Sequence, residues 1–253
     1  MEGAELGLFM LSACSFAVLL EHPSSPLQQA IESGLARRVL MGLAMGATLI
    51  ALVHSRWGQR SGAHMNPAFT LTYWMLGKVG RTDTAFYVAA QFVGGVLGVF
   101  VAALLIGPPL GHMAVDYAAT RPGDGGPWLA FAGEFAIATT QMTAVLVTSN
   151  SVRFRRYTPY VAGALVALYI ALEAPLSGMS MNRARTLGSA LIAGDFTALW
   201  IYFTAPLLGM GTAALLYALG RGTRRVYCAK LHHHNRQRCI FCCNYEAMDV
   251  ESI

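Results

Sequence analysis

Two segments with matching residues carry the side chains best suited to hold a small polar molecule. Residues 61–71 read SGAHMNPAFTL and residues 177–187 read SGMSMNRARTL, with seven of eleven positions identical. Each copy contains one asparagine, Asn66 or Asn182. An asparagine amide accepts through its oxygen and donates two N–H groups, so it can cap a helix and still bind a neutral ligand.

Each asparagine begins a short apolar stretch, 66–77 or 182–193. Asparagine is favoured at helix N-caps, and a helix rises about 1.5 Å per residue. Each stretch therefore predicts a helix under about 20 Å long, which reaches halfway through a hydrocarbon layer of about 30 Å. Two positive helix ends meeting at that depth would pass neutral molecules and repel cations, hydronium included.

The composition indicates a membrane protein around these segments. Of the 253 residues, 55% are hydrophobic and 12% charged, about half the charged fraction of a soluble domain. The net charge of +5 comes from basic residues in short loops beside apolar spans, where they orient a membrane protein. Nucleic acid is therefore not an expected partner.

Six spans of suitable length are predicted, and three of them separate the two asparagine segments, so the second unit must be inserted upside down. The predicted fold is an all-α membrane protein with six transmembrane helices and two re-entrant half-helices in an inverted repeat, its two units covering about residues 5–107 and 128–220. The spans are expected at about 5–21, 37–55, 85–107, 128–149, 158–173 and 198–220.

The basic residues predict that both termini lie in the cytoplasm, although Arg37 and Arg38 fall on the opposite side. We expect a transmembrane domain over residues 1–220. Residues 221–253 are expected to form a separate, poorly ordered cytoplasmic tail that is basic and contains cysteine and histidine.

The tail contains weak candidates for metal ligands, Cys239, Cys242 and His232. Their spacing matches no standard zinc finger, and two alternatives stay open: palmitoylation of the cysteines and contact of a solvated basic tail with anionic lipid. No metal site and no cofactor are therefore predicted.

Together these residues resemble the aquaporin and aquaglyceroporin family, the major intrinsic proteins, over about residues 5–220. The resemblance implies an hourglass pore in every subunit, a homotetramer in lipid, most often in the plasma membrane, and diffusion of water, glycerol or similar uncharged solutes. The residues matching the two signatures of that family are Asn66, Pro67, Ala68, Asn182, Arg183 and Ala184.

One residue departs from the pattern of the resembled family. Its second signature is usually Asn-Pro-Ala-Arg, and its two prolines pack against each other, whereas Arg183 here stands opposite Pro67. An unpaired charge at the bilayer midplane costs several kcal/mol. Arg183 could narrow the pore, strengthen the exclusion of cations or loosen the junction of the half-helices.

The resemblance also suggests four residues for a selectivity filter. Arg185 matches the filter arginine of the family, and spacing assigns Gly46, Ile170 and Met179 to the other positions. A shift of one residue would replace Gly46 by Met45 or Ala47. A small, aliphatic and methionine-lined filter is typical of passage for glycerol, urea, ammonia or metalloid hydroxides as well as water.

Three further polar residues receive structural roles from the resemblance. Glu5 and Glu134 are expected to accept hydrogen bonds from backbone N–H groups of the re-entrant segments, and a proton relay is the alternative. His64 is expected to form pore wall or anchor its loop, not to bind metal.

The resulting functional prediction is a passive channel for water and small neutral solutes that excludes ions and protons, with no enzymatic activity. Its partners would be neutral solutes and membrane lipid. A non-conducting junction or scaffold protein of the same fold is the alternative, because Arg183 could block the midplane. A secondary transporter is a third interpretation, but the sequence lacks an acidic cluster that could bind a coupling ion.

Overall fold

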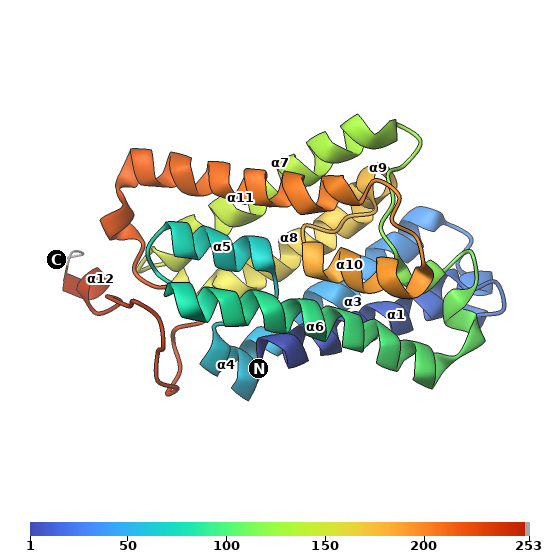
Figure 1. Ribbon diagram of the computed structural model, residues 1–253, viewed down its shortest axis with the longest axis horizontal. Helices are drawn as coiled ribbons and strands as arrows, with labels where there is room; N and C mark the ends of the chain where they lie inside the picture. Colours follow the sequence, from blue (N-terminus) through green and yellow to red (C-terminus); the bar gives the residue numbers. More distant parts are fainter. Residues whose placement is uncertain (251–253) are drawn as a thin grey trace.

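The computed structural model describes residues 1–250, and every regular element within that range is helical, which confirms the predicted all-α fold class. Figure 1 shows the longest helices running side by side along the long axis of the molecule. The six long helices are α1 (Glu2–Glu21), α3 (Gly34–His54), α6 (Arg81–Ile106), α7 (Gly126–Ser149), α8 (Thr158–Leu172) and α11 (Leu199–Arg221).

Five of these helices, within residues 1–250, are long and apolar enough to cross a membrane: α1, α3, α6, α7 and α11. The sixth, α8, has 15 residues and a length of about 22 Å, below the thickness of a typical hydrocarbon layer. The short helix α9 (Ala174–Ser177) follows α8 after a single residue and extends the same chain path. The other short helices are α2 (Pro26–Ala30), α4 (Arg56–Ser61) and α12 (Ala247–Val250).

The two predicted half-helices are α5 (Pro67–Met75) and α10 (Arg183–Ala193). Both lie inside the bundle, one in each half of its length, with their N-termini toward the middle (Figure 1). Proline at the first position of α5 is suited to a helix start, since the N–H it lacks would have no partner within the helix.

Glycines allow the long helices to pack with their backbones in close contact. A Cβ atom added at Gly94 of α6 would lie 2.0 Å from the carbonyl oxygen of Gly3 in α1. A Cβ atom at Gly209 of α11 would lie 2.5 Å from the carbonyl oxygen of Phe135 in α7. Small residues at such crossings are typical of membrane helices, which associate mainly through close packing.

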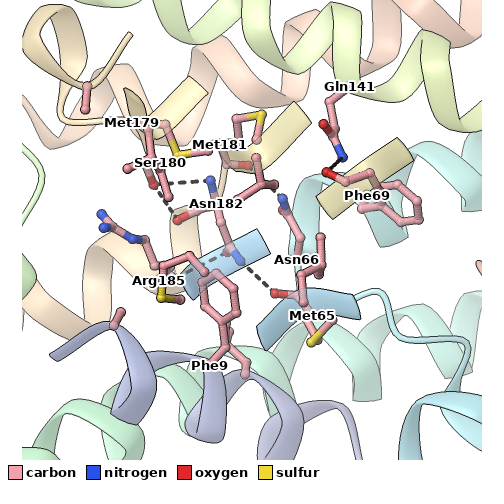
Figure 2. A pocket seen from close by; sticks show the side chains of 18 of the residues that line it. Phe9, Met65, Asn66, Phe69, Gln141, Met179, Ser180, Met181, Asn182 and Arg185 are labelled. Carbon is pink, nitrogen blue, oxygen red and sulfur yellow. Dashed lines mark hydrogen bonds between the residues drawn. The ribbon is translucent and has the colours of Figure 1, made fainter. Parts of the chain in front are cut away.

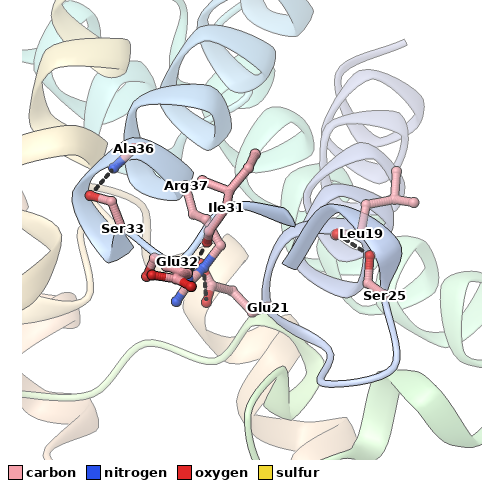
Figure 3. Close-up of polar contacts among 8 residues, drawn as sticks. All are labelled: Leu19, Glu21, Ser25, Ile31, Glu32, Ser33, Ala36 and Arg37. Carbon is pink, nitrogen blue, oxygen red and sulfur yellow. Dashed lines mark hydrogen bonds and ion pairs between the residues drawn. The ribbon is translucent and has the colours of Figure 1, made fainter. Parts of the chain in front are cut away.

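Arg37, which runs against the predicted orientation, has local partners. Its guanidinium pairs with Glu21 at 3.1 Å and donates to the carbonyl oxygens of Ile31 and Glu32 at 2.8 and 3.1 Å (Figure 3). Arg38 donates to the carbonyl oxygen of Ala171 at 3.3 Å. Arg37 therefore holds the connection between α1 and α3, and Arg38 links α3 to α8.

The linker between the two repeats is held at the same end of the molecule by Arg121. Its guanidinium pairs with Asp116 at 2.6 Å and with Asp195 at 2.7 Å. The pKa of Asp195 lies below its usual range, chiefly because Thr197 donates its hydroxyl and backbone N–H groups to the carboxylate, with a smaller contribution from Arg121. This loop contains two single-turn 3₁₀ helices, Pro108–Gly111 and Asp116–Ala118.

The C-terminal segment differs from the separate, poorly ordered tail expected from the sequence. Residues 226–231 are each at most 6% exposed. The backbone N–H of Tyr227 donates to Asn150 Oδ1 at 2.8 Å, and that of Leu231 donates to the carbonyl oxygen of Gly62 at 3.2 Å. The segment therefore packs against both repeats at the end of the bundle where α4 lies (Figure 1).

Candidate functional site

The backbone leading into each half-helix adopts the same unusual conformation. In each copy a glycine and two larger residues have positive φ, at positions that match between the repeats. Such conformations cost of order 1 kcal/mol or more for residues other than glycine, so surrounding contacts must hold them. The residues and their φ values are Gly62 (93°), Ala63 (58°), Met65 (49°), Gly178 (80°), Met179 (47°) and Met181 (52°).

A buried carboxylate holds the second segment. Glu134 of α7 accepts hydrogen bonds from the backbone N–H groups of Ser180 and Met181 at 2.6 and 2.7 Å and from the hydroxyl of Ser177 at 2.9 Å. Its side chain is fully buried. Hydrogen bonds to a charged acceptor are about twice as strong as neutral ones, so Glu134 can offset the strain of this backbone.

The matching carboxylate in the first repeat is Glu2, not Glu5 as predicted. Glu2 accepts from the backbone N–H groups of His64 and Met65 at 3.0 and 2.6 Å, which are the positions equivalent to Ser180 and Met181. Glu5 instead accepts from the hydroxyl of Ser61 at 2.9 and 3.1 Å.

Glu2 was missed because a carboxylate beside a chain start is ordinarily solvated. The side chain of Gln91 in α6 supports it by donating to Glu2 Oε2 at 2.7 Å. One sequence signal was available: two acidic residues, Glu2 and Glu5, lie close together in the first apolar span, and only one of them can occupy the position equivalent to Glu134.

Each asparagine caps its own half-helix. The Oδ1 atom of Asn66 accepts from the N–H of Ala68 at 2.9 Å, and that of Asn182 accepts from the N–H groups of Ala184 and Arg185 at 3.0 and 3.3 Å. This is the geometry of an N-cap, in which the side chain satisfies N–H groups that have no partner within the helix.

The same asparagines join the two half-helices. Asn66 Nδ2 donates to the carbonyl oxygen of Met181 at 2.7 Å, and Asn182 Nδ2 donates to that of Met65 at 2.6 Å (Figure 2). Each amide has two N–H groups, so one per side chain stays available to a ligand. We call Asn66 and Asn182 with these reciprocal bonds the crossed asparagine pair.

Arg183, which takes the place of the second-signature proline, points toward α11. Its guanidinium carbon lies 5.9 Å from the centre of the Phe203 ring, within the range of a cation–π contact. Its Nε and Nη2 atoms have no hydrogen-bond partner among residues 1–250. The contact that the structure gives this guanidinium is therefore the face of an aromatic ring.

A cavity of about 240 Å³ lies beside the crossed asparagine pair (Figure 2). Its wall is mostly apolar, with a few polar groups at the asparagines, Gln141 and Arg185. One end is bordered by Glu21 and Arg38, and the other by residues of the first re-entrant segment and the tail. The lining includes Phe9, Met41, Met45, Leu49, His64, Asn66, Phe69, Val166, Ile170, Met179, Asn182, Arg185 and Leu231.

Three of the four predicted filter residues, Ile170, Met179 and Arg185, line this cavity. The Nη1 atom of Arg185 has no hydrogen-bond partner in the part of the chain that the structure describes, so it can donate to a ligand. The fourth assignment, Gly46, is wrong: a Cβ atom there would lie 2.5 Å from the carbonyl oxygen of Gly163, at the crossing of α3 and α8.

Apart from Arg38 at one end of the cavity, the side chains that α3 contributes to it are those of Met41, Met45 and Leu49. They recur every four residues and so share one face of the helix. Gly46 follows Met45 directly and therefore lies about a quarter of a turn away, on the face that packs against α8.

We expect Gly46→Ala to destabilise the protein without changing which solutes it passes. The added methyl group would meet a backbone oxygen, and overpacking of this kind costs about 1–3 kcal/mol. The matched control is Gly220→Ala in α11, where no atom lies within 4 Å of the added Cβ among the described residues. Thermal unfolding in detergent should show a lower midpoint for Gly46→Ala alone; equal midpoints would contradict the assignment of Gly46 to the helix crossing.

His64 connects the first re-entrant segment to the tail. Its Nδ1 atom lies 3.0 Å from Thr70 Oγ1 and its Nε2 atom 2.8 Å from the carbonyl oxygen of Ala229. Its ring stacks on that of Phe241 with centroids 5.3 Å apart. In the second repeat Ser180 and Thr186 take the places of His64 and Thr70, with their hydroxyl oxygens 2.5 Å apart.

Comparison with known proteins relates this geometry to one family. The sequence model of the family described as Major intrinsic protein matches residues 6–217. Aquaporin A of Dictyostelium discoideum is 32% identical over 163 residues, which cover 62% of this chain and 57% of that protein. Aquaporin NIP3-1 of Arabidopsis thaliana is 30% identical over 214 residues, which cover 78% of this chain and 64% of that protein.

The fold is also that of a solved structure, the aquaglyceroporin from Plasmodium falciparum. The two superpose with a TM-score of 0.66 and 18% identity, covering 85% of this chain and 93% of that one. At this identity the likeness concerns the fold. The chain spans just over half the length of Aquaporin A and just under two thirds of that of Aquaporin NIP3-1.

Proposed function

Because this chain belongs to the major intrinsic protein family, and is an integral membrane protein as that family and its apolar helices require, we propose that it is a passive channel for water and small neutral solutes. The observation that carries the proposal is the crossed asparagine pair on the wall of a cavity that also receives Arg185. The transport domain would comprise residues 1–220.

The charges around the cavity support exclusion of ions. The positive ends of α5 and α10 both point at the crossed asparagine pair, and the Arg185 guanidinium adds a full positive charge. A neutral molecule can accept hydrogen bonds from these donors, whereas a cation or hydronium would be repelled and would lose its hydration. An anion would have to leave water for a wall that is mainly apolar.

The apolar part of the wall supports solutes with both carbon and hydrogen-bonding groups. Met41, Met45, Ile170 and Met179 offer flexible or aliphatic surface near Arg185. A glycerol-like molecule could lay its carbon chain along this surface while its hydroxyl groups meet the arginine and the asparagines. Urea, ammonia and metalloid hydroxides are further members of the proposed solute class.

The position of Arg183 favours conduction over a scaffold role. The scaffold alternative depends on Arg183 blocking the midplane, but its guanidinium stacks over Phe203 on the α11 side. We further propose a homotetramer in the plasma membrane with both termini in the cytoplasm, and no enzymatic activity.

The test is a panel of solutes on reconstituted protein. Vesicles containing the full chain should shrink and reswell in glycerol and urea gradients faster than empty vesicles, and water flux should also exceed that of the lipid. A proton gradient across the same vesicles should decay no faster than in empty ones. Permeability equal to that of empty vesicles for every solute would contradict the proposal.

We expect Arg183→Pro to keep or raise the water flux. The substitution places the resembled family's usual residue at the first turn of α10, where the N–H that proline lacks is not needed by the helix. It also removes a guanidinium that forms no ion pair within residues 1–250 and lies over the Phe203 ring. Stopped-flow light scattering compares the two proteins, and a loss of flux would show that Arg183 is part of the working pore wall.

A further inference from the structure

Four potential metal ligands from the tail converge in the structure. They are Cys228, His233, Cys239 and Cys243, and one ligand atom from each lies within 4.8 Å of the other three. The Sγ atoms of Cys228 and Cys239 are 3.4 Å apart, and His233 Nε2 is 3.2 Å from Cys243 Sγ. Cys228 is buried and all four cysteines of the tail are free thiols.

These separations suit a single tetrahedral ion. Zinc binds thiolate sulfur at about 2.3 Å and imidazole nitrogen at about 2.0–2.1 Å, so neighbouring ligand atoms of a tetrahedron lie about 3.3–3.8 Å apart. Three cysteines and one histidine form one of the standard ligand sets of structural zinc sites. Soft sulfur ligands disfavour magnesium and calcium, which prefer oxygen.

Further contacts shape the loop that carries the ligands. The His233 ring stacks on Tyr245 with centroids 3.8 Å apart. The Lys230 ammonium donates to Asn235 Oδ1 and to the carbonyl oxygen of Gln237, both at 3.2 Å. Of the weak candidates identified in the sequence, only Cys239 belongs to the cluster within the described residues. Cys242 is exposed.

The segment that carries the cluster lies across one end of the cavity. Leu231 is part of the cavity wall, and its N–H donates to Gly62 of the first re-entrant segment. Phe241 stacks on His64, which also lines the cavity. The N–H of Cys242 donates to the carbonyl oxygen of Lys78 at 3.0 Å, which fixes the far side of the segment beyond α5.

We propose that Cys228, His233, Cys239 and Cys243 bind one zinc ion, and that this ion fastens Leu231 and Phe241 over the entrance of the cavity. The four ligands close a loop of 16 residues that contains both of these side chains. A bound ion would restrict this loop to the arrangement in which they cover the entrance, and removal of the ion would release it. The effect on permeability rests on the proposed channel function, whereas the metal site does not.

Metal content tests the site directly. The full chain, purified with a thiol reductant, is incubated with zinc chloride, dialysed, and measured by inductively coupled plasma mass spectrometry. We expect about one zinc per chain. Cys239→Ser combined with Cys243→Ser should bind less than a tenth of that amount, while the neighbouring Cys242→Ser should bind as the wild type does.

The site would be overturned if the wild-type protein retained no zinc after dialysis. It would also be overturned if Cys242→Ser lost as much zinc as the double-serine variant. A disulfide would also overturn the site. It would appear as a protein mass lower by two hydrogens after purification without reductant, and this lower mass would remain after zinc is added. Size-exclusion profiles matching the wild type show that each variant is folded.

A proteolysis measurement tests the position of the tail without using permeability. Arg236 and Arg238 are exposed trypsin sites inside the loop. We expect zinc to slow their cleavage in wild type at least tenfold relative to chelated protein, and to leave the double-serine variant unprotected. If the wild-type protein binds zinc but is cleaved at the same rate with and without it, zinc does not hold the loop in place and this part of the proposal is overturned.

Permeability tests the effect of zinc on the entrance of the cavity. Glycerol flux through wild type should rise at least twofold after chelation, and the double-serine variant should show the higher flux with or without zinc. An unchanged flux in a protein that conducts would overturn the effect on the entrance. If the protein conducts glycerol neither with zinc nor after chelation, the proposed channel function is contradicted. The zinc content and the trypsin cleavage would still decide whether the metal site exists.

Discussion

Glu134→Gln is expected to abolish solute flux and to destabilise the fold, whereas Glu5→Gln should retain both. Glu134 accepts two backbone N–H groups and one hydroxyl of the second re-entrant segment. A glutamine amide would keep one acceptor oxygen but turn an NH₂ group toward a backbone N–H. One buried donor would then have no acceptor, next to a backbone already held at positive φ at Met179 and Met181.

The expected loss is about 3–5 kcal/mol, because each orphaned buried N–H costs about 1–3 kcal/mol and the charge assistance of the other bonds also disappears. That is a large share of the 5–15 kcal/mol typical of folded proteins. Among the described residues, Glu5 accepts from the Ser61 hydroxyl alone, and this hydroxyl can donate equally to a glutamine oxygen. Glu5→Gln should therefore change stability by no more than about 1 kcal/mol.

Thermal unfolding in detergent, followed by glycerol flux in vesicles, separates the two variants. Glu134→Gln should lower the midpoint by about 10 °C or more and reduce flux to the level of empty vesicles. Glu2→Gln should behave like Glu134→Gln, because Glu2 holds the backbone of the first repeat. If Glu5→Gln were the more damaging of the two substitutions in the first helix, the assignment of Glu2 would be incorrect.

The elements of this fold could be predicted because they depend on local sequence. The long apolar runs predicted the long helices, and most predicted helix ends lie within a few residues of the observed ones. The repeated Ser-Gly and Asn residues predicted the two half-helices. The Asn caps follow from a strong local preference, and the caps of α5 and α10 are formed by Asn66 and Asn182.

The choice between neighbouring residues depended on tertiary packing and could not be predicted. Gly46 and Met45 differ by one position, and only the crossing of α3 and α8 decides which of them faces the cavity. Glu2 and Glu5 lie on the same helix, and the depth of the first re-entrant segment decides which carboxylate reaches its N–H groups.

The tail was misjudged for a different reason. Its polar and basic composition is typical of a solvated segment, but residues 226–231 gain their burial from the end of the helical bundle. The ligand cluster likewise depends on a turn that brings Cys228 back to Cys239, and cysteine spacing alone does not reveal it. Arg183 is similar, since its partner Phe203 lies on the next helix, α11, and only the packing of α10 against α11 brings the two side chains together.

Ile170→Trp is expected to close the cavity. Ile170 of α8 lines it together with Arg185 and Met179. An indole in this place would fill space that a solute must cross, and the surrounding helices pack too closely to move aside. The matched control is Leu168→Trp, two residues earlier on the same helix, where the side chain is 50% exposed and points away from the core.

Conduction through this cavity is therefore tested most directly by the glycerol and water permeability of vesicles that contain equal amounts of wild type, Ile170→Trp or Leu168→Trp, each with a matching size-exclusion profile. We expect flux at the level of empty vesicles for Ile170→Trp and wild-type flux for Leu168→Trp. Wild-type flux through Ile170→Trp would contradict this expectation, because solutes would then cross the membrane by a path other than the cavity beside Asn66 and Asn182.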